Sequence, residues 1–375
     1  MDDFVRVATS GAASELRAMT TQADCSPDAS MLLTGYNQRR FIAEAIEGAF
    51  RQTYPRLEIV LSDDASTDDT YAVMESMAAG YRGPHSIVLN RNARNLGVAR
   101  HISDLAQRAR GRFLFIAGGD DVSLPNRVSR CMEVWATQVN PPSMVFTNLR
   151  TIDEHGRELQ PAFFIRQEKR AGVLVGLKFA QHSGSADIPE LSTLPESLYR
   201  CVIGASMAFD RRLIDEFGPL AKELAVEDVP LSFRALLAGS VEYVDEPLVD
   251  YRRHSLNFLP DDTSADLRAR AEDRNFRAWL TFAKTYLRDA HTAWCKGMIN
   301  RSTYNKLRSH ILYAQYRRRT EIRLRDCDYG LSLLEACAGM ICGGRRLHFC
   351  SWLAREYMPA LAAALRCGGS KAGLA

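Results

Sequence analysis

The feature that most constrains this chain is a regular alternation of short apolar runs with amphipathic segments between about residues 30 and 146. Apolar runs of four to six residues bounded by turn residues are typical of buried strands, and an i, i+3/i+4 apolar spacing is typical of helices. The sequence predicts strands over 30–34, 57–61, 86–89, 112–117 and 143–146, and helices over 41–51, from 67–70 onward, 98–110 and 125–138.

Strands that alternate with helices at this spacing form βαβ units, so we expect an α/β fold with a mixed, mostly parallel sheet and helices on both faces. In such sheets, ligands bind outside the carboxyl ends of the strands. Polar clusters follow three of the predicted strands, at Thr34–Asn37, Ser62–Ser66 and Gly118–Asp121. The sequence therefore predicts a ligand site at this edge.

Composition supports a folded core: 46% of the residues are hydrophobic and 25% are charged, which is ordinary globular usage. We expect no transmembrane segment and no secretory signal, and nine scattered cysteines without a CxxC pair agree with a reducing compartment. We therefore expect a cytoplasmic protein, either free or peripheral on the inner face of the cytoplasmic membrane.

The predicted organisation has three parts. Residues 1–29 are expected to be a flexible leader, residues 30–257 the catalytic domain, and residues 258–375 a basic, helical C-terminal region. From residue 266 to the end, the chain has 20 Lys and Arg residues but only 9 Asp and Glu residues. Such a region could dock on an anionic membrane, pack on the core or form a homo-oligomer. Neither a nucleic-acid reader motif nor an aromatic stacking platform is evident, so we do not expect nucleic acid as a partner.

Three acidic pairs carry the candidate chemistry. Asp120 and Asp121 follow a predicted strand and two glycines, and their hard oxygen atoms suit Mg²⁺ or Mn²⁺, although the pair could instead cap the next helix. Asp63 and Asp64 could read a nucleobase or simply form an Asx turn.

The third pair, Glu227 and Asp228, precedes a helix predicted over 231–238 and could supply a general base or merely favour the helix dipole. His254 lies among cations, and it is either a solvated residue or a phosphate or metal contact.

Taken together, the motifs of residues 30–257 resemble family 2 glycosyltransferases with the GT-A fold, which implies an inverting enzyme with a divalent metal cofactor. The motifs that carry this resemblance are Thr34–Asn37, Phe41–Ile46, Gln52–Pro55, Leu57–Asp68, Asn95–Gly97, Ala109–Phe113, Gly118–Asp121 with Leu124 and Pro125, Glu227–Arg234 with Ala238 and Gly239, and Tyr251–His254.

The resemblance implies a role for each candidate residue. The nucleotide-sugar site would comprise Thr34, Tyr36, Asp63, Asp64, Arg100, Asp120 and His254. Asp121 would coordinate the metal with Asp120 and His254, while Asp228 would be the catalytic base with Glu227 as its neighbour. The implied partners are a nucleotide-sugar donor, with a UDP-sugar as the first expectation, and a saccharide or lipid-linked acceptor of polysaccharide, lipopolysaccharide or glycolipid synthesis.

Two departures from the family pattern stand out: Gly118 replaces a frequent Asp, and His101 replaces a frequent Asn. The rival interpretations are a sugar-nucleotide nucleotidyltransferase and a homologue that binds sugar nucleotides without catalysis. The first would be expected to carry a Gly-rich basic loop after its first strand, which Thr34–Asn37 lacks.

Overall fold

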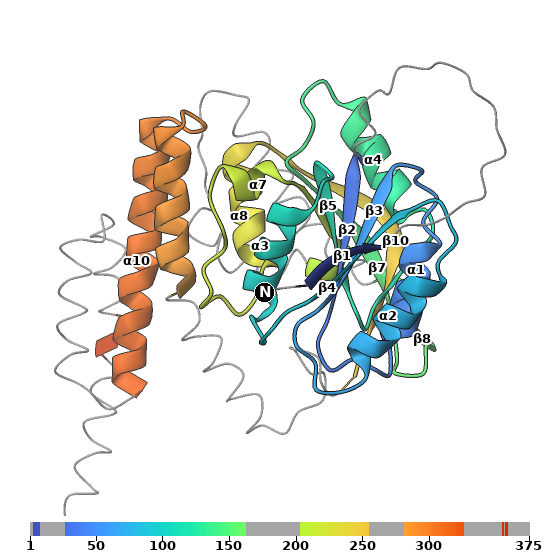
Figure 1. Cartoon of the computed structure of the whole chain (residues 1–375). Coiled ribbons are helices and arrows are strands. Elements are labelled where there is room, and N and C mark those ends of the chain that lie inside the picture. The colour runs from blue at the N-terminus through green and yellow to red at the C-terminus, as the bar shows by residue number, and fades with distance from the viewer. Residues whose placement is uncertain are drawn as a thin grey trace, which may run out of the picture. The chain divides into compact units, whose positions relative to one another are not determined.

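The computed structural model describes residues 3–7, 27–162, 203–254 and 281–325, together with residues 355, 357 and 358. Most of the expected leader, part of the expected C-terminal region and the boundary at residue 257 lie outside these residues. Figure 1 shows the chain in these terms. Residues 1–185 and 196–262 form one compact unit, and residues 186–195 and 263–375 form a second.

The first unit is built on a ten-stranded mixed sheet with the strand order β1-β4-β3-β2-β5-β9-β7-β10-β6, with β8 paired to β7. The strands cover Asp3–Val7 (β1), Ala29–Gly35 (β2), Leu57–Asp63 (β3), Ser86–Arg91 (β4), Phe113–Gly118 (β5), Val122–Ser123 (β6), Met144–Ile152 (β7), Glu158–Gln160 (β8), Met207–Asp210 (β9) and Val241–Arg252 (β10).

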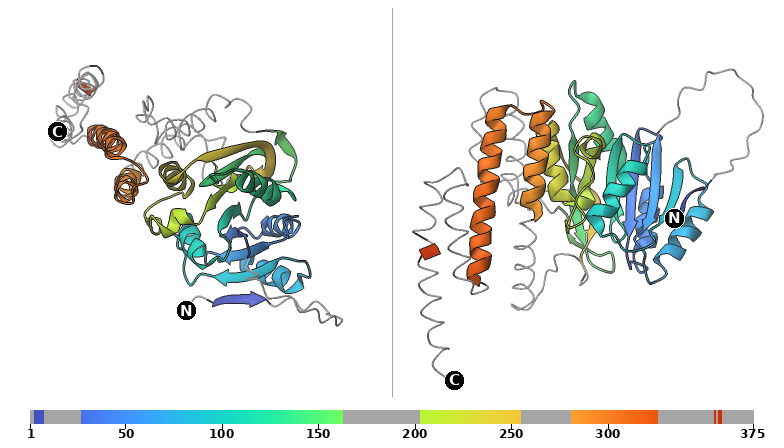
Figure 2. Two further views of the ribbon diagram at one scale, coloured as in Figure 1. Left: turned by 90° about the horizontal axis from the view of Figure 1, so that it is seen from above. Right: turned by 60° about the vertical axis from the view of Figure 1, so that its left-hand side comes forward.

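The helices of this unit are α1 (Ile42–Phe50), α2 (Thr70–Gly80), α3 (Val98–Arg108), α4 (Arg127–Thr137), α7 (Arg212–Asp215) and α8 (Asp228–Ala238), with a 3₁₀ turn, η1, at Gly204–Ser206. Apolar side chains of α1, α2 and α4 pack on one face of the sheet, in the same core cluster as Met31 and Leu33 of β2. Helices α3, α7 and α8 lie on the opposite side (Figures 1 and 2). Both faces are therefore covered, which is why β3 is buried along its whole length. This confirms the predicted GT-A-type fold class.

The parallel block β4-β3-β2-β5 creates the crevice that positions the site. From β2 the chain passes through α1 to β3 and then β4, and it returns through α3 to β5 on the other side of β2. The strand order thus reverses at β2, and the carboxyl ends of β2 and β5 flank a topological switch point. Strand β10 runs parallel to β7 and pairs through its last residues with β6, which brings its end to the same edge.

Part of the expected leader is ordered. Residues 3–7 form β1, which pairs antiparallel with β4 and covers that edge of the sheet. Backbone pairing needs no strong side-chain pattern, so the sequence gives little warning of such a strand.

Among the described residues, the second unit shows two helical segments, residues 281–295 and α10 (Arg301–Arg325). Gly297 follows the first segment with a φ of 73°, which favours glycine, and the N–H groups of Gly297 and Met298 donate to the carbonyls of Trp294 and Ala293. Trp294 stacks on Tyr304 with ring centroids 4.9 Å apart. The described part of the C-terminal region is thus helical, as predicted.

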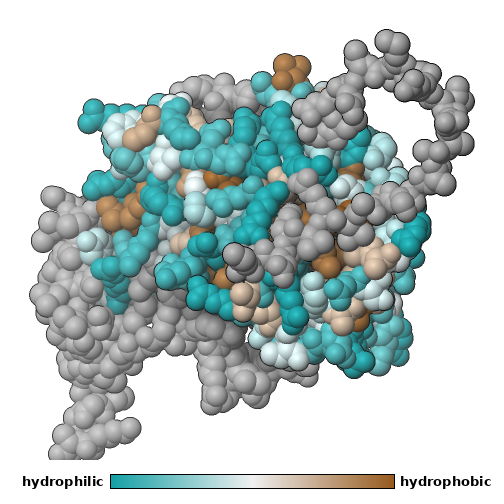
Figure 3. All heavy atoms as spheres, in the orientation of Figure 1, coloured by the Kyte–Doolittle hydropathy of each residue, from teal (hydrophilic) through white to brown (hydrophobic). Residues whose placement is uncertain are grey.

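In the part of the chain that the structure describes, no helix combines the length and the apolar character needed to cross a membrane. The face of the molecule in Figure 3 is largely hydrophilic where it is described, with small and separated apolar patches.

Candidate active site

A cavity of about 650 Å³ opens at the carboxyl ends of β2 and β5. Five carboxylates line it, together with the guanidinium group of Arg253: Asp64, Asp120, Asp121, Glu227 and Asp228. They come from three segments far apart in the chain, which the sheet topology brings to one edge. The structure therefore places the predicted acidic residues around one cavity, with Asp63 as the exception described below.

The acidic turn after β5 is fixed from β10. The backbone N–H of Arg252 donates to Asp121 Oδ1 at 2.9 Å, and the Arg252 guanidinium donates to the carbonyl of Asp120 at 2.9 Å and to Glu44 at 2.6 Å. The Arg252 side chain is buried and also lies over the ring of Phe41. Although turns are ordinarily mobile, this one is held by several contacts at once.

The two carboxylates of this turn converge over Gly118. A Cβ atom at Gly118 would lie 2.8 Å from Asp120 Oδ1 and 3.0 Å from Asp121 Oδ2, so both oxygen atoms reach the space that glycine leaves open. Burial, with the charge of Asp120 as the second cause, raises the pKa of Asp121 well above its usual value. A divalent cation would relieve this repulsion between close carboxylates.

The donor set therefore fits a Mg²⁺- or Mn²⁺-type ion that takes two carboxylates and completes its coordination with water and substrate phosphate. It is not a closed protein site, because no group of three His, Cys, Asp or Glu side chains among the described residues could hold a metal ion. His254 does not converge as a third ligand: its Nε2 lies 3.0 Å from Asp120 Oδ2, and its ring stacks on Phe41. In this geometry His254 orients Asp120.

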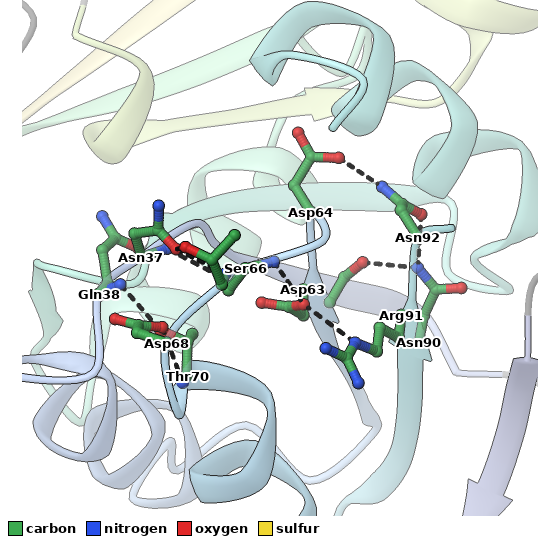
Figure 4. A network of polar contacts seen from close by, with 12 residues as sticks. Asn37, Gln38, Asp63, Asp64, Ser66, Asp68, Thr70, Asn90, Arg91 and Asn92 are labelled. Atoms are coloured by element: carbon green, nitrogen blue, oxygen red, sulfur yellow. Dashed lines mark hydrogen bonds and ion pairs between the residues drawn. The ribbon is translucent and has the colours of Figure 1, made fainter. Parts of the chain in front are cut away.

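Asp64 is held in a dense network at the end of β3 (Figure 4). Its Oδ1 accepts hydrogen bonds from Asn92 Nδ2 at 2.7 Å and from the N–H of Leu96 at 2.9 Å, and its Oδ2 accepts one from the N–H of Gly97 at 3.0 Å. Only 4% of Asp64 is exposed. This carboxylate shapes the loop before α3 and at the same time lines the cavity.

Thr34 and Tyr36 line the cavity from the end of β2, as predicted for nucleotide contacts. Tyr36 is 47% exposed, which leaves its ring accessible to a ligand. Next to it, Asn37 adopts a left-handed conformation with φ 53° and is anchored by Ser66 Oγ, which accepts its backbone N–H at 2.9 Å.

Glu227 and Asp228 lie at the start of α8, with Gly204 directly against them. Burial, followed by the charge of Asp228, raises the pKa of Glu227 to about 8. Burial also raises the pKa of Asp228 to about 6, although backbone N–H groups of Val229 and Gly204 oppose the shift. Asp228 is consequently a carboxylate of raised basicity, beside a carboxyl group that retains its proton at neutral pH.

Three predicted site residues lie outside the cavity lining: Asp63, Arg100 and His254. We keep His254 because it contacts Asp120, which lines the cavity, and we remove Asp63 and Arg100 from the candidate site. Asp63 is fully buried, where its Oδ2 accepts the backbone N–H of Ser66 at 3.0 Å and lies 3.6 Å from Arg91 Nε. Arg100 pairs with Asp104 one turn along α3, at 2.7 Å. Adjacent side chains of a strand point in opposite directions, so only one residue of the Asp63–Asp64 pair can face the ligand.

Sequence reasoning assigned no role to two lining residues with polar or charged side chains, His101 and Arg253. For His101 a signal exists, since it shares the buried face of α3 with Ile102 and Leu105, where a polar side chain needs an explanation. For Arg253 the signal was weaker, because it lies beside residues that the motifs already single out.

A mixed α/β sheet with a switch-point cavity rimmed by paired carboxylates is the arrangement expected of the GT-A fold class. The family comparison agrees with this fold: residues 30–184 match the family described as "Glycosyl transferase family 2".

Individual relatives agree with this assignment. EpsE of Bacillus subtilis (strain 168), which carries the name of a glycosyltransferase, is 30% identical over 130 residues that cover 35% of this chain and 46% of EpsE. Chondroitin synthase of Escherichia coli is 28% identical over 130 residues, which cover 35% of this chain and 18% of the synthase. The chain thus spans about half or less of the length of these relatives.

Among solved structures, residues 1–349 of S. aureus TarS in complex with UDP-GlcNAc are similar in fold. The TM-score is 0.51 at 12% identity, and the similarity covers 86% of this chain and 91% of that one.

Proposed function

We propose that residues 30–257 form a catalytic domain that transfers a sugar from a nucleotide-sugar donor to an acceptor hydroxyl with inversion at the anomeric carbon. The observation that carries this proposal is that Asp64, Asp121 and Asp228, from three distant segments, line one cavity. Such a transfer requires three groups around one cavity: one that binds the nucleobase (Asp64), one that binds the cation (Asp121) and one that accepts a proton (Asp228).

The donor would occupy the side of the cavity formed by β2 and β3. Thr34, Tyr36 and Asp64, which line this cavity, would contact the nucleoside, and Asp120 would lie near the ribose. A UDP-sugar is the first candidate donor. The structural neighbour TarS was solved with UDP-GlcNAc, which supports this choice at the level of the fold.

Asp121 and Asp120 would hold a Mg²⁺ or Mn²⁺ ion against the diphosphate. The chemistry that this ion supplies when bound is neutralisation of the charge on the departing nucleoside diphosphate. Arg252 and His254 keep the two carboxylates in place before substrate arrives.

Asp228 would act as the general base. Its carboxylate takes the proton of the acceptor hydroxyl while the hydroxyl oxygen attacks the anomeric carbon, and the bond from that carbon to the diphosphate oxygen breaks. Attack from the face opposite the leaving group inverts the configuration. The raised pKa of Asp228, about 6, strengthens it as a base while leaving it ionised at neutral pH.

Cell-surface polysaccharide, lipopolysaccharide or glycolipid synthesis is the proposed setting, and the acceptor would be a saccharide or a lipid-linked saccharide. The basic C-terminal region would place the enzyme on an anionic membrane on the cytoplasmic side. Liposome co-sedimentation of the full chain, with phosphatidylglycerol against phosphatidylcholine vesicles, tests this. Equal binding to both vesicle types would contradict it.

The test of function is a thermal-shift panel of UDP-, GDP- and dTDP-sugars with and without Mn²⁺, followed by NMR of the released sugar or product. We expect one donor to stabilise the protein in a metal-dependent way. Asp228→Asn should still be stabilised by that donor but should lose turnover by about 10²–10⁴-fold. A product of retained configuration, or an undiminished turnover in Asp228→Asn, would contradict the mechanism.

A further inference from the structure

The most informative unassigned residue in the cavity is His101, the fourth residue of α3. It lines the cavity although it is only 2% exposed. Burial lowers its pKa, so the ring is neutral and carries a proton on one of its two nitrogen atoms. Which nitrogen carries the proton decides what His101 can offer to a ligand.

The orientation of the surrounding amides follows from Asp64. The carboxylate can only accept, so the group of Asn92 that faces it at 2.7 Å must be the donating NH₂. The carbonyl oxygen of Asn92 therefore points to Asn90, whose NH₂ group donates to it at 3.1 Å. Rotating the Asn90 amide would set two carbonyl oxygens against each other, even though Asn90 Oδ1 has no partner in the described structure.

The same reasoning reaches His101 through Ser62. The NH₂ group of Asn90 also donates to Ser62 Oγ at 2.8 Å, and Ser62 is fully buried. Within the described residues, the remaining neighbour of this hydroxyl is His101 Nε2, at 2.5 Å. The hydroxyl proton of Ser62 is satisfied only if His101 Nε2 accepts it, which leaves the ring proton on Nδ1.

The cavity lining thus holds a donor, His101, together with an acceptor, Asp64, with which His101 interacts electrostatically. His101 Nδ1 makes no hydrogen bond within the described part of the chain, so its N–H is available to a ligand. The Asp64 carboxylate accepts three protein hydrogen bonds, two on Oδ1 and one on Oδ2, and so retains acceptor capacity on Oδ2.

We propose that His101 is a specificity-determining residue that donates from Nδ1 to a nucleobase carbonyl, beside the ring N–H that Asp64 accepts. This edge, an N–H next to a C=O, occurs in uracil, thymine and guanine. Cytosine and adenine lack it, and their exocyclic NH₂ group would meet the His101 N–H. The inference rests on the proposed function, since it requires a nucleotide in this cavity.

Binding of nucleoside diphosphates by isothermal titration calorimetry, with Mg²⁺ present, tests the proposal in two pairs, UDP against CDP and GDP against ADP. We expect the first member of at least one pair to bind more tightly to the wild type. In His101→Leu the ratio of the two affinities within that pair should fall by roughly 5- to 100-fold, since one hydrogen-bond donor to the base is lost. His101→Asn, which keeps an N–H donor, should preserve most of the ratio.

The control is His85→Leu, which removes another buried neutral histidine outside the cavity and should leave the ratio unchanged. A merely structural role for His101 would weaken both members of a pair equally, and this outcome would overturn the proposal. Failure of all four nucleotides to bind the wild type would instead refute the proposed function itself.

A second measurement does not depend on substitution of His101. The ¹⁵N chemical shifts of the imidazole in the wild type should show the proton on Nδ1, and Ser62→Ala should release this preference. A proton on Nε2 in the wild type would overturn the proposal.

Discussion

The backbone N–H of Arg252, at the end of β10, donates a 2.9 Å hydrogen bond to the carboxylate of Asp121, which lies in the turn after β5. Residues 131 positions apart thereby fix the acidic turn after β5. The Arg252 guanidinium adds a bond to the carbonyl of Asp120. The turn is thus organised before any ligand binds.

We expect Arg252→Ala to destabilise the protein and to weaken Mn²⁺ binding. It leaves the carbonyl of Asp120 without this donor and opens a space beside Phe41, so the free energy of unfolding should fall by about 2–4 kcal/mol. Urea unfolding measures this change. Arg40→Ala is the matched control, because it removes an exposed pair with Glu154 and should cost less than about 1 kcal/mol. Equal effects would refute the role assigned to Arg252.

Gly204→Ala should damage activity without unfolding the protein. An added Cβ atom would lie 2.1 Å from Glu227 Oε1, so the Glu227 side chain must move. Displacement of groups around the proposed base should lower kcat/KM by roughly 10²-fold. Gly80→Ala, where an added Cβ meets nothing within 4 Å, provides the comparison and should retain full activity. Similar kcat/KM values for both variants would show that Glu227 tolerates the shift.

The sequence predicts the central strands well because a parallel strand covered on both faces gives a continuous apolar run. Strand β3 is the clearest case, with all seven residues buried. Strands β6 and β9 are only two and four residues long, which is too short to show a period, and their antiparallel pairing was not predicted.

Helix α8 shows how a proline can mislead. The sequence places its start at Leu231, after Pro230, whereas the helix begins at Asp228. Proline is tolerated in the first turn because its missing N–H would have no partner within the helix. As a result, Asp228 lies inside the helix start rather than in the preceding loop.

The sequence predicted those residues of the candidate site that belong to motifs, and it did not predict contacts that depend on the three-dimensional arrangement. Asp64, Asp121 and Asp228 follow from their strand and helix ends. By contrast, nothing in the sequence shows that Asp63 turns inward to Ser66, or that Arg252, 131 positions along the chain, contacts Asp120 and Asp121. Such contacts depend on the order of strands in the sheet.

Metal dependence should reside in the acidic turn. Asp121→Asn removes a charged oxygen ligand, so we expect the Mn²⁺-dependent part of the thermal shift with donor to disappear. Turnover should fall by about 10²–10³-fold, because charge on the diphosphate is no longer offset. Asp104→Asn is the control, because Asp104 pairs with Arg100 outside the cavity lining. It should leave the Mn²⁺-dependent thermal shift and the turnover unchanged. A metal response preserved in Asp121→Asn would exclude this residue as the ligand.

The acidic limb of the pH profile should report Asp228. Burial raises its pKa from 3.8 to about 6, and only the deprotonated form can accept the acceptor proton. We therefore expect kcat/KM to rise with pH up to about 6 and then to level off. A limb centred near 4 would show that Asp228 is solvated in the free enzyme and would contradict the environment described above.

The stability of the protein should decrease with increasing pH, whereas kcat/KM should increase. The cause is Glu227, whose pKa rises from its ordinary value of 4.5 to about 8 in the folded protein. Between these two pH values the folded state holds a proton that the unfolded state has lost, so the free energy of unfolding falls as pH increases. Glu227→Gln removes the titrating group, and its unfolding free energy should fall less steeply over the same range. Urea unfolding of both proteins at pH 5 and pH 8 measures the difference. Parallel pH dependences would mean that Glu227 is ionised in the native state, and the neutral neighbour assigned to Asp228 would be wrong.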